Sequence, residues 1–208
     1  MKRLALLGAS GHGKVVADAA LAAGWQDVVF FDDVWPSLEN NGRWQIVGDT
    51  AALLARVHEF DGVLVSIGNC DARWQKQRSL QEAGATIAVV VHPRACVSSY
   101  ARLGRGSVVM PNAVINVDAC IGEAAVVNTG ATIDHDCVLG NGVHVAPGAH
   151  LSGNVRVGDC SWVGVGAAVR QGVHIGARVM VGAGAAVVNE VADGVTVVGC
   201  PAKPISRA

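Results

Sequence analysis

Residues 157–175 read VGDCSWVGVGAAVRQGVHI, and every sixth residue of this stretch is aliphatic: Val157, Val163, Val169 and Ile175. The same spacing continues in both directions from Val97 to Val187, without insertion or deletion, over sixteen positions that are all Leu, Ile or Val. The residue two places before each aliphatic one is Ala, Ser, Cys or Val. Glycine follows the aliphatic residue at seven positions: Gly104, Gly122, Gly140, Gly158, Gly164, Gly176 and Gly182.

A period of six fits neither the 3.6 residues of a helix turn nor the alternation of an ordinary strand. It predicts a parallel β-helix in which each hexapeptide forms one short strand and one corner, so that three hexapeptides make an 18-residue coil. We expect the aliphatic residue to point inward and the smaller residue to allow tight packing. We also expect the glycine after the aliphatic residue to relax the turn.

Composition excludes several classes of protein. The chain has 208 residues and a formal charge of −1, which gives no electrostatic reason to expect nucleic acid or an anionic membrane as partner. Apolar residues at 51% and charged residues at 16% argue against disorder, and no apolar run approaches the length of a membrane-spanning helix. The apolar stretch after Met1-Lys2-Arg3 ends at Gly8, too early for a signal peptide, so we expect a cytoplasmic protein.

The six cysteines form no C-x-x-C pair. Their wide spacing fits neither a zinc ribbon nor a disulfide framework, and we expect most of them to be small buried thiols.

The first ninety residues follow a different pattern. Apolar runs at 4–7, 28–31, 62–67 and 86–91 predict strands, and 14–23 and 72–82 predict helices. This alternation indicates a small parallel α/β sheet of the Rossmann type. The loop Gly8–Gly13 reads G-x-x-G-x-G, which differs from the dinucleotide fingerprint G-x-G-x-x-G. At the start of a helix such a loop favours phosphate, and Asp32-Asp33 after the second strand stands where a carboxylate often meets a ribose. A tight turn and a solvated acidic pair would explain the same residues.

Five motifs occur together in the chain: Gly8-Ala-Ser-Gly-His-Gly13, Asp32-Asp33, Ile67-Gly68-Asn69, NTGATIDHDC at 128–137, and VGCPAK at 198–203. This combination resembles the sialic acid O-acetyltransferase and bacillosamine N-acetyltransferase family of hexapeptide-repeat nucleotide-sugar acetyltransferases. Within it, the chain is most similar to the perosamine N-acetyltransferase branch. The resemblance spans nearly the whole chain.

The resemblance implies a left-handed β-helix that forms a homotrimer, with acyl-CoA sites between neighbouring subunits. Residues 1–92 would be a Rossmann-like domain that binds the nucleotide sugar, and residues 93–208 the acetyl-CoA-binding and catalytic β-helix. The co-substrate would be acetyl-CoA, without a metal. The acceptor would be the 4-amino group of a nucleotide-linked 4-amino-4,6-dideoxy sugar, with GDP-perosamine favoured over a UDP-amino-sugar.

The resemblance also implies roles for particular residues. Ser10, Gly11 and His12 would contact the pyrophosphate. Asp32 and Asp33 would contact the ribose or base, and Gly68 and Asn69 would line the same cleft. Asn128 belongs to the motif that carries the catalytic residues and is expected to contact substrate. His135 would be the catalytic base, with Asp136 beside it. His144 would contact acyl-CoA, the Gly153 N–H would face the oxyanion, and Val165 and Ala183 would line the pantetheine arm.

The residue types support this chemistry independently. His135 stands two residues after the inward-facing Ile133, which places it on the outer surface of a coil. A neutral imidazole can take a proton from an attacking amine, and Asp134 or Asp136 could fix its tautomer. The tetrahedral oxyanion needs a donor such as a backbone N–H, and no covalent intermediate is required, so direct transfer in a ternary complex is expected.

Alternatives remain open at this point. His135 could be a solvated turn residue, and His144, His150 and His174 share one repeat position, as a structural ladder would. The same scaffold could O-acetylate a sugar such as sialic acid. A metal-dependent hydratase would need three convergent histidines, which His135, His144 and His150 do not reproduce in the usual pattern. A non-enzymatic nucleotide-binding scaffold is a further alternative.

Overall fold

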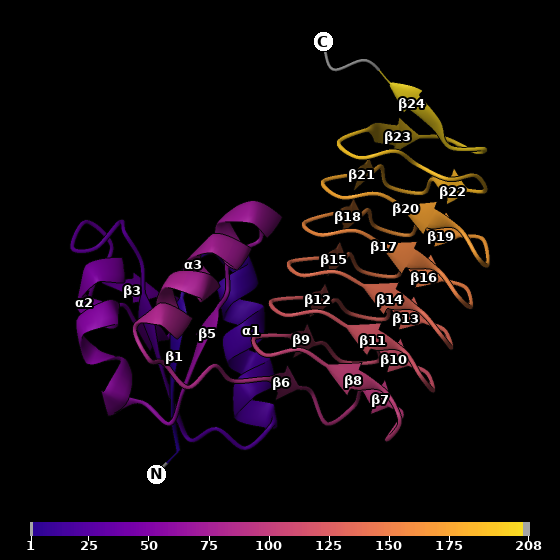
Figure 1. Cartoon of the computed structure of the whole chain (residues 1–208). Coiled ribbons are helices and arrows are strands. Elements are labelled where there is room, and N and C mark those ends of the chain that lie inside the picture. The colour runs from indigo at the N-terminus through magenta and orange to yellow at the C-terminus, as the bar shows by residue number, and fades with distance from the viewer. Residues whose placement is uncertain (1, 206–208) are drawn as a thin grey trace. The chain divides into compact units, whose positions relative to one another are not determined.

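The computed structural model describes residues 2–205, and the chain divides into two compact units, Met1–Pro93 and Arg94–Ala208. The first contains helices and a small sheet, and the second is a stack of short strands (Figure 1).

A three-stranded parallel sheet lies at the centre of the first unit. Its strands are β1 (Arg3–Leu7), β2 (Asp27–Phe31) and β5 (Gly62–Val65), in the order β2-β1-β5. The register pairs Leu4 of the central strand with Val28 on one side and Gly62 on the other. Because all three strands run in the same direction, the loops after them meet at one edge of the sheet, where ligands of open α/β folds bind.

Helices flank this sheet: α1 (Gly11–Ala22), α2 (Thr50–Arg56), the 3₁₀ turn η1 (Val57–Glu59) and α3 (Cys70–Glu82). A hairpin of β3 (Asn40–Asn41) and β4 (Trp44–Gln45) follows β2, and β6 (Val90–Val91) comes last. Buried apolar side chains from β1, β2, β5, α2, η1 with the residue after it, and α3 form one cluster: Ala5, Leu7, Phe31, Leu53, Val57, Phe60, Val63, Val65 and Leu80.

The predicted elements of this unit need four corrections. The first helix begins at Gly11 instead of residue 14, so Gly11, His12 and Gly13 form its first turn. The strand predicted for 62–67 ends at Val65, and the helix predicted from residue 72 begins at Cys70. The strand predicted for 86–91 is reduced to a bridge from Ile87 to Val63 and the two-residue β6. Nothing was predicted for 34–61, where the structure has the hairpin, α2 and η1.

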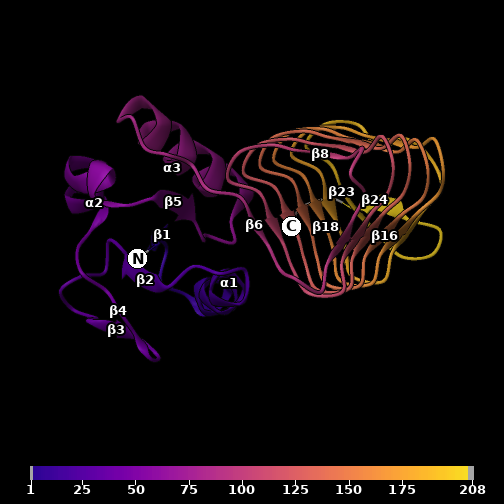
Figure 2. The ribbon, with the colours of Figure 1, turned by 90° about the horizontal axis from the view of Figure 1, so that it is seen from below.

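The second unit is a β-solenoid, as the hexapeptide period predicts (Figure 1, Figure 2). Sixteen two-residue strands each end on one of the sixteen aliphatic positions. They are β7 (Cys96–Val97), β8 (Arg102–Leu103), β9 (Val108–Val109), β10 (Val114–Ile115), β11 (Cys120–Ile121), β12 (Val126–Val127), β13 (Thr132–Ile133), β14 (Val138–Leu139), β15 (His144–Val145), β16 (His150–Leu151), β17 (Arg156–Val157), β18 (Trp162–Val163), β19 (Ala168–Val169), β20 (His174–Ile175), β21 (Met180–Val181) and β22 (Ala186–Val187).

Each strand from β7 to β19 pairs in parallel with the strand 18 residues further along, as Val114 does with Thr132. Three faces result: β7-β10-β13-β16-β19-β22, β8-β11-β14-β17-β20, and β9-β12-β15-β18-β21. Fourteen of the sixteen aliphatic side chains are buried, and the two half-buried ones, Val97 and Leu103, belong to the first coil. The solenoid ends at β23 (Thr196–Val198), which pairs in parallel with β21 and antiparallel with β24 (Lys203–Ile205).

The prediction that the glycine after the aliphatic residue relaxes the turn is wrong. The left-handed backbone lies two residues further on, as at Asn112 (φ 60°), Asp118 (φ 59°) and Asp136 (φ 61°). The glycine after the aliphatic residue instead allows coils to approach each other. A Cβ on Gly122 would lie 2.5 Å from the carbonyl carbon of Gly140 in the next coil.

Within residues 2–205, no helix is both long enough and apolar enough to cross a membrane.

Candidate active site

His135 lies at the corner that follows β13. The left-handed conformation of Asp136 turns the chain there, and Asp tolerates this conformation better than most residues. The Asp134 carboxylate fixes the corner from the other side, because its Oδ1 accepts hydrogen bonds from the backbone N–H of His135 at 2.8 Å and from Asn116 Nδ2 at 2.9 Å. These two donors hold the pKa of Asp134 below its usual value. The histidine is therefore held by its backbone while its side chain stays 55% exposed.

Asp136 makes the contact to the imidazole ring. Its Oδ2 lies 2.7 Å from His135 Nδ1. An ionised carboxylate only accepts hydrogen bonds, so Nδ1 carries a proton and the neutral ring presents Nε2 as its acceptor. The hydrogen bond to Asp136, together with the nearby charge of Asp134, raises the pKa of His135. Between the two acids that the sequence offered as partners of the ring, the structure gives the contact to Asp136.

Gly153 lies directly against this ring, one coil further along. A Cβ on Gly153 would stand 2.6 Å from both Cε1 and Nε2 of His135. Only a residue without a side chain leaves the imidazole in this position. The structure therefore brings His135, Asp136 and Gly153 together.

The neighbouring thiol of Cys137 is not available as a nucleophile. Its side chain is buried, its Sγ lies 3.2 Å from the carbonyl oxygen of Ser152, and burial raises its pKa. A thiol held in its protonated form is a poor nucleophile.

A second cluster lies on the face formed by β12, β15 and β18. His144 is 3% exposed, its Nε2 lies 3.1 Å from Asn128 Nδ2, and its ring stacks on that of Trp162 with centroids 3.9 Å apart. The N–H of Thr129 donates to Asn128 Oδ1, which leaves the Asn128 Nδ2 group to donate to the His144 ring. The buried state of His144 distinguishes it from His150 and His174, which occupy the same repeat position but are exposed.

Val165 and Ala183 are exposed corner residues after β18 and β21. They are stacked one coil apart, and the N–H of Gly184 donates to the carbonyl of Val165 at 2.8 Å. Together they form a small apolar strip on the outside of the solenoid.

The first unit gathers the other predicted residues at the edge where β1, β2 and β5 end. Ser10 is the N-cap residue of α1, and Gly11 and His12 form the first turn of that helix. Asp32 connects the loop after β1 with the loop after β2. Its Oδ2 accepts a hydrogen bond from the N–H of Ala9 at 2.6 Å, and its Oδ1 accepts one from the N–H of Val34 at 3.1 Å. Asp32 therefore holds the loop before α1 in place.

Asp33 is held by groups that the sequence did not identify. Its Oδ1 accepts from the N–H of Thr50 and its Oδ2 from Lys76 Nζ, both at 2.9 Å. Hydrogen bonds from Thr50 and from Lys76 lower the pKa of Asp33 to about 2. Lys76 also donates to the hydroxyl of Thr50 at 2.8 Å, so these three side chains form one polar cluster.

Arg73 of α3 is a second residue that sequence reasoning missed. It is completely buried, and its Nη1 donates to the carbonyls of Ile67 and Gly68 at 2.9 and 2.8 Å. Asn69 in the same loop caps α3 by accepting from the N–H of Ala72 at 2.9 Å. Burial and the charge of Arg73 lower the pKa of His12 to about 4, so His12 is neutral at physiological pH. No run or spacing in the sequence marks Arg73, because its partners are backbone carbonyls.

Within residues 2–205, no group of three or more His, Cys, Asp or Glu side chains is arranged to hold a metal ion.

Comparisons with known proteins agree with this architecture. The family model described as the PglD N-terminal domain matches residues 3–80. The acetyltransferase domain of PglB from Neisseria gonorrhoeae, solved with acetyl coenzyme A, is 42% identical and superimposes with a TM-score of 0.94 over 98% of this chain and 99% of that one. A variant of GDP-perosamine N-acetyltransferase from Caulobacter crescentus, solved with CoA and GDP-perosamine, is 37% identical, with a TM-score of 0.94 over 100% of this chain and 98% of that one.

A curated relative, UDP-N-acetylbacillosamine N-acetyltransferase of Bacillus subtilis, is 37% identical over 117 residues. That match spans 52% of this chain and about half, 51%, of the relative. The parallel sheet followed by a left-handed β-helix defines the class of hexapeptide-repeat acetyltransferases. The chain belongs to the family of nucleotide-sugar acetyltransferases that includes PglB and GDP-perosamine N-acetyltransferase.

Proposed function

We propose that the protein transfers an acetyl group from acetyl-CoA to the 4-amino group of a nucleotide-linked 4-amino-4,6-dideoxy sugar. The observation that carries this proposal is the pair of His135 Nδ1 and Asp136 Oδ2, 2.7 Å apart at an exposed corner of the β-helix. The relatives whose names state an acceptor are N-acetyltransferases, which favours an amine over a hydroxyl. For this chain, O-acetylation is the less favoured alternative.

In this mechanism the sugar amine attacks the thioester carbonyl of acetyl-CoA directly. The nitrogen–carbon bond forms, and the carbonyl electron pair moves to oxygen, where a backbone N–H such as that of Gly153 stabilises it. His135 Nε2 accepts the proton that the amine loses, while Asp136 holds the Nδ1 proton and stabilises the imidazolium. Collapse of the intermediate breaks the carbon–sulfur bond, and His135 returns the proton to the departing thiolate.

Each unit supplies one substrate site in this proposal. Residues 1–92 bind the nucleotide sugar: Ser10, Gly11 and His12 contact the diphosphate, with Asp32, Asp33, Gly68 and Asn69 around the same edge. The N–H groups at the start of α1, which no side chain caps, suit an anion there. Residues 93–208 bind acetyl-CoA, with Val165 and Ala183 along the pantetheine arm. His144 contacts acetyl-CoA in this proposal, and Asn128, whose Nδ2 lies 3.1 Å from His144 Nε2, contacts the substrate.

We further propose that the active protein is a homotrimer with its acetyl-CoA sites between subunits. The exposed position of His135 and of the Val165–Ala183 strip supports this, since neither is covered by its own solenoid. Sedimentation equilibrium should give three times the mass of the chain. A monomer that is fully active at assay concentration would contradict the intersubunit site.

A panel of nucleotide-linked amino sugars tests the reaction itself. Each sugar is incubated with acetyl-CoA, and the products are analysed by mass spectrometry and by titration of the free thiol. We expect one acetyl group to be gained per CoA released. Thiol release without acetylation of any sugar in a panel that includes GDP- and UDP-linked 4-amino sugars would contradict the proposal.

A further inference from the structure

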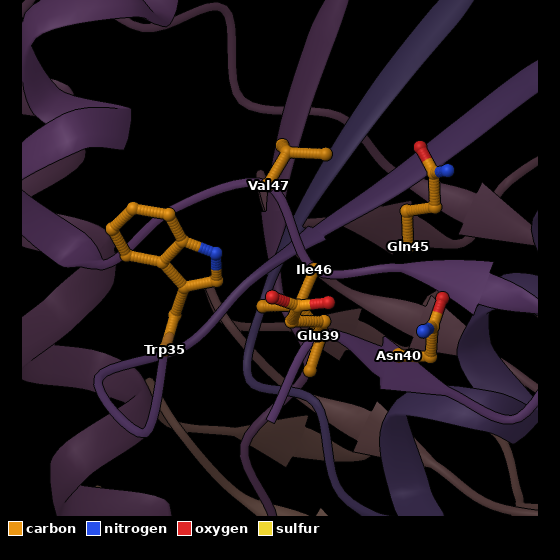
Figure 3. A pocket seen from close by; sticks show the side chains of 6 residues that line it. All are labelled: Trp35, Glu39, Asn40, Gln45, Ile46 and Val47. Carbon is orange, nitrogen blue, oxygen red and sulfur yellow. The ribbon is translucent and has the colours of Figure 1, made fainter. Parts of the chain in front are cut away.

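We infer that a pocket beyond the end of β2 binds the nucleobase of the sugar nucleotide and selects guanine over uracil. This inference rests on the proposed function, because it names the base of the same substrate. The family leaves the question open, since the relatives' names include both a GDP-linked and a UDP-linked sugar. The pocket has a volume of about 190 Å³ and is lined by Trp35, Glu39, Asn40, Gln45, Ile46 and Val47 (Figure 3).

The walls of the pocket are tied to the loop where the diphosphate is proposed to bind. The N–H of Trp35 donates to the carbonyl of Asp32 at 3.0 Å, and the Asp32 side chain accepts from the N–H of Ala9. On the other wall, the buried Asn41 of the hairpin donates from Nδ2 to the carbonyl of Ser10 at 3.1 Å. A base in the pocket and a diphosphate at α1 would thus be held by connected segments.

Trp35 offers an aromatic surface for stacking. Its side chain is 41% exposed, although tryptophan is usually well buried, and it extends from a turn at the end of β2 (Figure 3). Planar bases stack on such rings with little regard to their identity. Trp35 therefore accounts for binding a base, but not for choosing one.

Glu39 supplies the selection. Figure 3 shows its carboxylate between the Trp35 ring and the side chains of Asn40 and Gln45. Among the described residues, this carboxylate has no hydrogen-bond or ion-pair partner, so both oxygens can accept from a ligand.

Guanine presents two adjacent donors, N1–H and the exocyclic N2–H, which match the two oxygens of one carboxylate. Uracil presents a single N3–H between two carbonyl oxygens, and a carboxylate repels both of them. The amides of Asn40 and Gln45 can donate to the acceptors O6 and N7 of guanine. The donor pattern of the pocket therefore fits guanine better than uracil.

Calorimetric titration of the full chain with GDP and with UDP tests this inference. The unmodified protein should bind GDP at least about tenfold more tightly than UDP, the effect of one well-formed bidentate contact. Glu39→Gln should weaken GDP binding by roughly 10- to 100-fold and leave UDP binding nearly unchanged. Trp35→Ala should weaken both nucleotides by about tenfold or more. Leu38→Ala is the matched control, because Leu38 is exposed on the same segment but does not line the pocket.

Equal affinities for GDP and UDP, or a ratio that Glu39→Gln does not change, would overturn the inference. The proposed function would stand in that case if a UDP-linked amino sugar is acetylated. Conversely, selective GDP binding without acetylation of any GDP-linked amino sugar would contradict the proposed function and leave the base pocket intact. Thermal unfolding of each variant checks its fold; if Trp35→Ala does not fold, the exposed Glu39→Gln substitution decides the question.

Discussion

At the scale of single residues, three consecutive side chains at one corner have three different roles. Asp134 binds the backbone of the corner, His135 presents Nε2, and Asp136 holds Nδ1. The sequence places all three on the outside of a coil. The residue types alone leave both Asp134 and Asp136 as candidates for the ring contact, and only the family resemblance favours Asp136. The choice depends on how the chain turns at Asp136, which occupies the repeat position where the backbone is left-handed, three residues after the aliphatic one.

Asp136→Asn should change the pH dependence of the reaction. Because Asp136 raises the pKa of His135, the acid limb of kcat/KM should lie above the ordinary histidine value of about 6.5 in the unmodified protein. Removing the charge should move this limb to lower pH while lowering the maximum rate, since the tautomer is no longer fixed. Asparagine also tolerates the left-handed backbone, so the corner should keep its fold.

Asp134→Asn is the matched control for this experiment. It keeps an oxygen that can accept from the His135 N–H and leaves the contact between His135 and Asp136 in place. Its acid limb should shift much less than that of Asp136→Asn. An equal shift in both variants would mean that the overall charge of the corner, and not the ring contact, sets the pKa of His135.

At the scale of elements, the glycines of the solenoid have different neighbours and therefore different uses. Gly153 faces the His135 ring, which is a side chain that can rotate, whereas Gly122 faces the backbone of the next coil. Both contacts are made between neighbouring coils, and the repeat predicts the 18-residue length of the coil. Which atoms each glycine meets depends on the stacking of particular corners, and the sequence alone does not show it.

Gly153→Ala should remove most activity with little loss of stability, because the His135 ring must leave its position. Gly122→Ala should instead lower the melting temperature, because the backbone of Gly140 has no room to move. Circular dichroism melts and steady-state rates on both variants would show the contrast. If Gly153→Ala kept full activity, the position of the ring against Gly153 would not matter for the reaction.

The two carboxylates after β2, Asp32 and Asp33, also have different roles, although they are adjacent in the sequence. Asp32 fixes a loop, and Asp33 joins the N-terminus of α2 to Lys76 of α3. The sequence could not predict this, because α2 was not recognised in the region 34–61.

Asp33→Ala should raise KM for the nucleotide sugar and leave KM for acetyl-CoA unchanged. The pKa of Asp33 is lowered to about 2, so its ionised form stabilises the folded protein fully at pH values above the ordinary aspartate pKa near 3.8. This stabilisation is lost as the pH falls through about 2. Nucleotide binding by the unmodified protein should therefore show no titration of Asp33 between pH 4 and 7. An unchanged KM for the sugar would remove Asp33 from the binding site.

At the scale of the whole molecule, the two units differ in how fully the sequence predicts them. The repeat predicts the sixteen strands β7 to β22, because each hexapeptide repeats the same local arrangement and contacts only its neighbours, but it does not predict β23 and β24. The first unit has no repeat, so no period in the sequence marks its hairpin, α2 or the buried Arg73, whose partners are the backbone carbonyls of Ile67 and Gly68.

Metal removal provides a prediction for the complete protein. Within residues 2–205, the chain offers no cluster of three metal-ligating side chains, and the mechanism uses an imidazole as its base. Dialysis against EDTA should leave the transferase rate unchanged. A rate that falls and is restored by added zinc would favour metal-dependent chemistry on this scaffold.

In the proposed reaction, His135 accepts the proton of the attacking amine. The most direct measurement is kcat for acetyl transfer by His135→Ala, with saturating acetyl-CoA and the best nucleotide amino sugar, compared with the unmodified protein. We expect kcat to fall by roughly 10²- to 10⁴-fold, the usual contribution of a general base, while the KM values change little. Turnover within a few-fold of the unmodified protein would mean that His135 is not the general base.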